Sequence, residues 1–184
     1  MIINENGLCR AMKQAYKRDG YTVMAEDGDV MLWTTEWFVQ EQEKKMPRKV
    51  MALVVEHMGA MPGKPTHLQK GTEPQIVMEC KAETEVGDWT DGATARRTGY
   101  VSMTVSGWQM MQERESLKCW AVEGESLDIV DSAVSVMQPG IVMEPCKIAW
   151  MHESELVVLE AHRPPAGNWL YEAWEALESI KLTD

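Results

Sequence analysis

The spacing of hydrophobic residues along the chain predicts both helices and strands. Over residues 6–19, Leu8, Met12 and Tyr16 recur at helical spacing, and Gly20 ends the pattern. A hydrophobic stripe with the helical period also recurs in three later stretches, which we expect to be helices: 47–58, 126–137 and 168–182. The chain therefore contains about four predicted helices.

Residues at the ends of the later helices support their predicted limits. Pro47 suits the first position of the helix 47–58, and Gly59 is typical of a helix end. Ser126 is expected to cap the third helix, and Asn168 opens the fourth. These signals come from the residue types alone and do not depend on the hydrophobic stripes.

Alternating apolar residues predict strands between the helices. The stretches 21–26 and 30–39 are expected to form a hairpin that turns at Asp27-Gly28-Asp29, because Asp-Gly is a favoured hairpin turn. Six further strands are expected at 76–81, 100–106, 108–114, 117–122, 143–151 and 155–162. The pattern predicts an α+β protein with two layers, in which helices cover a mainly antiparallel sheet.

A diverged internal repeat is the main organising feature that the sequence suggests. The string beginning Arg18-x-Gly20-Tyr21 recurs 79 residues later, beginning at Arg97, and the block 74–81 recurs at 139–147. We interpret the chain as one compact domain, 1–184. Its two tandem ββαβ-like units, 6–83 and 97–162, are followed by the helix 168–182 and related by a pseudo-two-fold axis. The alternative is a chance match in a methionine-rich sequence.

The composition is unusual in its large apolar residues. The 184 residues include 15 Met and eight Trp but only one Phe. Methionine fills irregular gaps in cores, and both Met and Trp are enriched at adaptable binding surfaces. A methionine-padded core is the favoured interpretation, and a methionine-lined binding surface is the alternative.

The charge restricts the class of partner. A net charge of −11 repels phosphate backbones and favours a protein partner with a basic surface. The dense basic stretch 44–49 adjoins acidic residues and is expected to be a solvated helix start. The N-terminal residues do not form a secretory signal, and the longest apolar run, 50–55, is far too short for a membrane span. We expect a cytoplasmic protein that does not enter the membrane.

The sequence carries no recognisable catalytic motif. Phosphate-binding glycine loops, the G-x-S-x-G elbow and the H-E-x-x-H zinc motif are all absent. The four cysteines are widely spaced, and two of them, Cys80 and Cys146, fall at matching positions in the two repeats, which favours small buried core residues. We therefore expect no metal, no cofactor and no catalytic activity.

Two sets of residues are the candidate sites. The first is a binding surface that combines Trp37 with the glycine-flanked loop carrying Asp88, Trp89 and Asp91, since loops that expose an aromatic side chain are common binding sites. The second is a polar site between the two repeats, and its candidate residues are His57, His152 and Cys119.

Three functions remain open from the sequence. A small acidic protein-binding or regulatory module without catalytic activity is the first hypothesis. The first alternative is a small-ligand-binding protein or enzyme with its site at the interface of the repeats. The second alternative is a structural subunit of a homo-oligomer.

Overall fold

The computed structural model describes residues 1–77, 92–102, 107–143, 146–164 and 169–183. Within these residues the chain is a mixed α+β protein, as predicted, with five helices and eleven strands. The helices are α1 (Glu5–Lys17), α2 (Arg48–Met58), α3 (Gly124–Leu127), α4 (Ser132–Met137) and α5 (Trp169–Glu178). The strands of the first half are β1 (Tyr21–Glu26), β2 (Asp29–Trp33), β3 (Trp37–Gln42), β4 (Thr66–Leu68) and β5 (Gln75–Ile76). Those of the second half are β6 (Thr94–Ser102), β7 (Trp108–Glu113), β8 (Cys119–Glu123), β9 (Gly140–Met143), β10 (Lys147–His152) and β11 (Glu155–Glu160).

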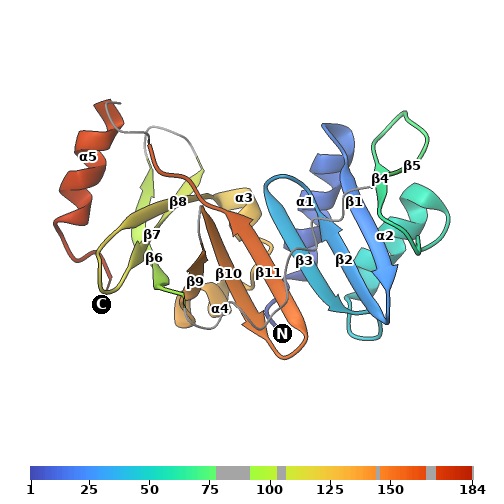
Figure 1. Cartoon of the computed structure of the whole chain (residues 1–184), viewed down its shortest axis with the longest axis horizontal. Helices are drawn as coiled ribbons and strands as arrows, with labels where there is room; N and C mark the ends of the chain where they lie inside the picture. The colour runs from blue at the N-terminus through green and yellow to red at the C-terminus, as the bar shows by residue number, and fades with distance from the viewer. Residues whose placement is uncertain (78–91, 103–106, 144–145, 165–168, 184) are drawn as a thin grey trace.

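All eleven strands belong to one sheet, in the order β5-β4-β1-β2-β3-β11-β10-β9-β6-β7-β8. The strand pairings are antiparallel throughout the described residues. Strands β3 and β11 pair at the centre and so join the first half of the chain to the second (Figure 1). The mainly antiparallel sheet predicted from the sequence is confirmed.

The first two helices form where the sequence predicts them, and their ends show why. In α1, the Asn4 side chain accepts hydrogen bonds from the backbone N–H groups of Asn6 and Gly7, which satisfies donors at the helix start. Helix α2 begins one residue later than expected, with Pro47 as its cap, and it ends at Gly59. That glycine adopts a φ of 90° and donates to the carbonyl of Val55 at 2.7 Å.

The helices cover both faces of the sheet, which corrects the prediction of two layers. The main core cluster unites buried residues of α1, α2 and α3 with one face of the sheet. Along β7 the side chains alternate between the faces, so Met111 joins this cluster while the adjacent Met110 packs with Cys119 on the opposite face. There, Trp174 and Leu177 of α5 cover them. The β7–β8 end of the sheet therefore has helices on both sides.

Two predicted elements are divided in the structure. The expected strand 30–39 breaks between β2 and β3, because the Thr34 side chain accepts hydrogen bonds from the backbone N–H groups of Glu36 and Trp37 and closes a turn. The expected helix 126–137 becomes α3 and α4. Ser126 lies inside α3, and Asp131, not Ser126, caps α4 by accepting from two backbone N–H groups.

Both halves are built in the same order. Three consecutive strands come first and a helical segment follows. The next strand then pairs with the first of the three. The resulting orders are β4-β1-β2-β3 and β9-β6-β7-β8. The matched block 74–81 does not fit this equivalence, since its described part, β5, pairs with β4, whereas the block at 139–147 contributes β9 beside β6. The matched block also runs past residue 77, outside the described residues. The duplication and its pseudo-two-fold axis stay predictions.

Candidate functional site

A pocket lies where the first half of the chain meets the second. The β3–β11 ladder brings the turn between β2 and β3 beside the end of β11, where the Glu160 backbone N–H donates to the Glu36 carbonyl at 2.8 Å. From the other side, the backbone N–H of Asn4 donates to the carbonyl of Ile129 at 2.8 Å and ties the start of α1 to the segment after α3. The end of α1, the β2–β3 turn and α3 therefore converge.

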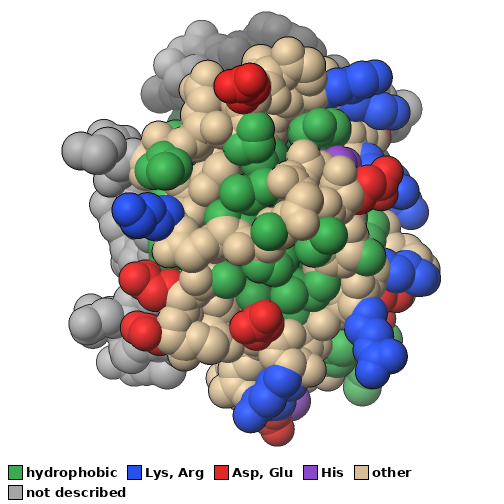
Figure 2. Space-filling view, turned by 90° about the vertical axis from the view of Figure 1, so that its right-hand side faces the viewer, with side chains coloured by type: hydrophobic (Ala, Val, Ile, Leu, Met, Phe, Trp, Pro, Cys, Tyr) green, Lys and Arg blue, Asp and Glu red, His purple; other side chains and the backbone are tan. Residues whose placement is uncertain are grey.

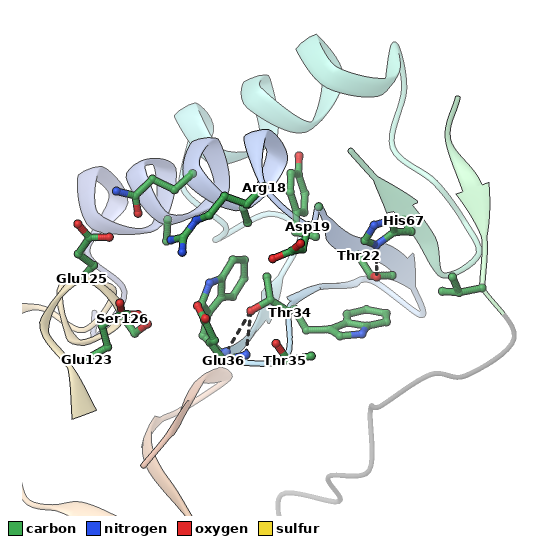
Figure 3. A pocket seen from close by; sticks show the side chains of 18 residues that line it. Arg18, Asp19, Thr22, Thr34, Thr35, Glu36, His67, Glu123, Glu125 and Ser126 are labelled. Atoms are coloured by element: carbon green, nitrogen blue, oxygen red, sulfur yellow. Dashed lines mark hydrogen bonds between the residues drawn. The ribbon is translucent and has the colours of Figure 1, made fainter. Parts of the chain in front are cut away.

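The pocket has a volume of about 280 Å³. Figure 3 shows Arg18 and Glu36 between the residues of the α3 region on one side and Thr22 and His67 on the other. Its charged and polar lining residues are Gln14, Arg18, Asp19, Thr22, Thr34, Thr35, Glu36, His67, Glu123, Glu125 and Ser126. Three aromatic side chains, Tyr21, Trp33 and Trp37, also line it and are largely buried. The volume suits one side chain or a very small molecule, because drug-sized ligands occupy pockets of roughly 300–1,000 Å³.

Local backbone geometry fixes one wall of the pocket. Gly20 has a φ of 83°, which favours glycine, and an added Cβ would lie 2.3 Å from Nε2 of His67. The absence of a side chain at Gly20 therefore leaves room for the His67 ring. That ring places Nδ1 3.4 Å from the Thr22 hydroxyl oxygen.

The pocket is rich in carboxylates. Four acidic residues line it, Asp19, Glu36, Glu123 and Glu125, against one guanidinium, Arg18. Burial raises the pKa of the Glu36 carboxyl above its ordinary value, and the negative charge of Glu123 raises it further, while Arg18 opposes both effects. Within the described residues, Arg18, Asp19, Glu36 and Glu125 form no ion pair. A cation that entered the pocket would relieve the repulsion between these carboxylates.

The three residues of the predicted polar site do not come together, and none of them lines this pocket. His57 lies on α2, where its ring stacks on Tyr16 at 3.8 Å and its Nδ1 is 2.9 Å from the Tyr21 hydroxyl. Burial lowers the pKa of His57. These contacts give His57 a packing role in the core of the first half.

The other two members of that set also lie on separate elements. His152 ends β10 with its Nδ1 3.9 Å from Glu155, and its side chain is about half exposed. Cys119 is buried in β8 beneath α5, and burial raises the pKa of its thiol to about 11, which leaves it protonated and unreactive near neutral pH.

The predicted binding surface is only partly described. Trp37 lines the pocket, but it is 4% exposed and belongs to the main core cluster. Asp88, Trp89 and Asp91 lie outside the described residues, as does Cys80. The binding role of Trp37 and of that loop stays a prediction.

Methionine side chains lie both in the core and near the surface. Six are buried, at positions 12, 24, 31, 46, 110 and 111. Met51, Met58 and Met61 are half-buried and pack against the main cluster around α2. Figure 2 shows hydrophobic side chains gathered near the centre of the face at this end of the molecule, with charges of both signs around them. Since both basic and acidic groups surround this surface, its charge selects no particular partner.

The residues that do converge were missed by the sequence analysis. Glu36 was included in the expected strand 30–39, and Glu123 follows directly after the expected strand 117–122 and was given no role. The Thr34-Thr35-Glu36 sequence carried the available signal, because a Thr two or three residues before exposed N–H groups favours a local turn. No such signal relates Glu36 to Glu123, since the sheet order alone brings them together.

The described residues contain neither a metal-ligand cluster nor a membrane-spanning helix. Among them, no group of three or more His, Cys, Asp or Glu side chains is arranged to hold a metal ion. None of the helices in the described part of the chain is both long enough and apolar enough to cross a membrane. The residues that line the pocket offer carboxylates, hydroxyls and aromatic rings as binding groups.

Comparisons with known proteins give no match: no protein-family model, no curated protein and no solved structure is similar to this chain.

Proposed function

We propose that this protein is a non-catalytic binding module that holds a cationic group of a protein partner in the pocket between its two halves. The observation that supports this most strongly is the set of four carboxylates contributed by both halves to one small aromatic-walled pocket. The raised pKa of Glu36 points the same way, because an electrostatically strained carboxyl in a cavity is typical of functional sites.

The charge distribution favours a basic partner over a neutral one. Residues 1–77 carry ten acidic and ten basic side chains, so the net charge of −11 arises entirely from residues 78–184. An acidic surface of this kind attracts basic proteins over a distance of about a Debye length and speeds their association. The second half then steers the partner, and the pocket at the junction holds it.

Binding is favoured over catalysis by the distances within two hydroxyl–base pairs of the pocket, of which the first, the Ser126 hydroxyl and the Glu123 carboxylate, is 3.3 Å apart. In the second, the Thr22 hydroxyl and His67 Nδ1 are 3.4 Å apart, and both distances are longer than the roughly 2.6–3.2 Å of an activated pair. An enzyme remains the second candidate because Glu36 has the raised pKa of a general acid. Turnover that is lost with Glu36→Gln would favour it.

We also propose that the fold arose by tandem duplication and that the pocket lies at the junction of the two copies. The equal strand orders of the two halves support this, as do the matched turn glycines Gly28 and Gly107, which have φ values of 87° and 91°. Interfaces between repeats are common places for binding sites.

The proposal predicts a salt-sensitive capture of basic proteins that depends on the pocket. The double variant Glu36→Gln/Glu123→Gln removes two pocket charges, and Glu172→Gln/Glu175→Gln removes two exposed charges from α5 as a matched control. We expect both the unmodified protein and the control to retain partners from a cell extract at low ionic strength. The pocket variant should lose most of them, as measured by quantitative mass spectrometry. Equal retention by both double variants would show that net charge alone recruits partners.

A further inference from the structure

On the basis of the proposed function, we propose that the pocket binds an arginine side chain of the partner in preference to a lysine side chain. The carboxylates Glu36 and Glu123 line the cavity together with the indole ring of Trp37, and this combination matches a flat cation. A guanidinium group donates from its edge to carboxylates and stacks its face on an indole ring.

The depth of the lining residues separates these two kinds of contact. Trp37 is 4% exposed and lies on the sheet face that α1 and α3 cover, while Trp33 points to the opposite face. Asp19, Glu36 and Glu125 are exposed at the entrance. A side chain that enters must therefore give up water before it reaches the aromatic wall. A guanidinium loses less hydration free energy than an ammonium group, so the cost of entry is smaller for arginine.

The carboxylates of the pocket come from separate elements of the two halves. Glu36 comes from the β2–β3 turn and Glu123 from the end of β8 before α3 (Figure 3). The five donors of a guanidinium point in fixed directions around its plane and can serve carboxylates on two sides. A lysine ammonium is a compact charge with three donors and gains less from this arrangement.

Arg18 lines the same pocket, so its replacement should change the binding of a cation in the direction opposite to the replacement of a carboxylate. Both Arg18 and Glu36 line the pocket, and the positive charge of Arg18 opposes the rise in the pKa of Glu36. It therefore competes with an incoming cation for the same carboxylates. Replacing Arg18 with a neutral residue should strengthen binding, and a variant that merely damaged the fold would not do so.

The size of the pocket favours a side chain presented by a polypeptide. At about 280 Å³ it accommodates one arginine side chain but leaves little space for a second group. The exposed carboxylates at the entrance remain available for the backbone N–H groups or neighbouring basic residues of the partner.

The test is a titration of the full chain with capped amino-acid amides, followed by ¹⁵N-correlated NMR at the backbone amides of Thr34–Trp37 and Glu123–Ser126. We expect N-acetyl-arginine amide to bind at least about ten-fold more tightly than N-acetyl-lysine amide, and the uncharged isostere N-acetyl-citrulline amide not to bind. Glu36→Gln should weaken arginine binding by about ten-fold and Arg18→Gln should strengthen it several-fold, while Glu172→Gln should leave it unchanged.

The outcomes separate this inference from the function on which it rests. Equal binding of the arginine and lysine amides at the pocket would overturn the selectivity for arginine and leave the cation-binding function standing. Shifts outside the pocket, or no binding of either cation, would overturn both. Strengthening by Arg18→Gln together with weakening by Glu36→Gln would support both.

Discussion

Glu36 illustrates how a single residue can oppose the stability of the fold. Its carboxyl lies where burial and the charge of Glu123 both disfavour ionisation. Because the pKa in the folded protein is raised, the unfolded chain releases this proton at lower pH than the folded chain. The folded state therefore loses stability as the pH rises from the ordinary value near 4.5 through the raised value. Residues that cost stability in this way are frequent at functional sites.

We predict that Glu36→Gln stabilises the fold at neutral and alkaline pH. The amide cannot ionise, so the variant avoids the loss that affects the unmodified protein above the raised pKa. The melting temperature of the variant should be slightly higher than that of the unmodified protein at pH 8, since solvent screens this exposed side chain, and the difference should shrink towards pH 5. Thermal unfolding followed by circular dichroism at several pH values measures this difference.

The control is Glu172→Gln, which removes an equal charge from an exposed position on α5. Its melting temperature should stay close to that of the unmodified protein at every pH. A Glu36→Gln variant that is destabilised at pH 8 would mean that the carboxylate is satisfied in the folded state, and the electrostatic basis of the proposed site would fail.

At the scale of elements, the sequence predicts regular segments well and their interruptions poorly. The helices α1 and α2 form as expected because periodic apolar residues and end signals agree at Gly20 and Gly59. The break between β2 and β3 was missed because apolar residues stand on both sides of the short polar sequence Thr34-Thr35-Glu36, which was included in the expected strand 30–39. Only the hydrogen bonds to the Thr34 side chain decide that a turn forms there.

The same limit explains why the candidate site was not predicted. Its residues come from the end of α1, the β2–β3 turn and the segment before α3, which are far apart in the sequence. Their proximity depends on the pairing of β3 with β11, and hydrophobic periodicity carries no information about which strands become neighbours. The alternation that identifies β11 would be equally compatible with another place in the sheet.

We predict that Glu178 fixes α5 to the edge strand β8. Its carboxylate accepts two hydrogen bonds of 2.7 Å from Arg163 and one of 2.8 Å from the backbone N–H of Cys119. Glu178→Ala should destabilise the protein by about 2 kcal/mol, because it leaves partly buried donors without acceptors. Urea denaturation measures the loss, and hydrogen exchange should show faster exchange at the amide of Cys119.

Glu175→Ala on the same helix is the matched control. Glu175 is exposed, and its side chain forms no hydrogen bond with any described residue, so its replacement should change stability by less than about 0.5 kcal/mol. Equal losses from the two variants would show that α5 is held only by the packing of Trp174 and Leu177.

For the molecule as a whole, the two halves are bound together by more than the central strand pair. The backbone N–H of Ile2, in the first half, donates at 2.9 Å to the carboxylate of Glu155, which is buried at the start of β11. The main core cluster likewise combines residues of both halves, for example Leu32 with Trp150. Neither half can unfold without exposing buried apolar surface of the other.

We therefore predict that the full chain unfolds in a single cooperative transition. Loss of either half would expose the paired edge of β3 or β11 and the shared core, so a state with only one half folded should be too unstable to accumulate. Urea unfolding followed in parallel by tryptophan fluorescence and by far-ultraviolet circular dichroism should give coincident midpoints. Two separated transitions would show that the halves fold independently. A pocket built at their junction would then vary with the relative placement of the halves, and it could not hold its four carboxylates in the fixed arrangement that selection of an arginine side chain requires.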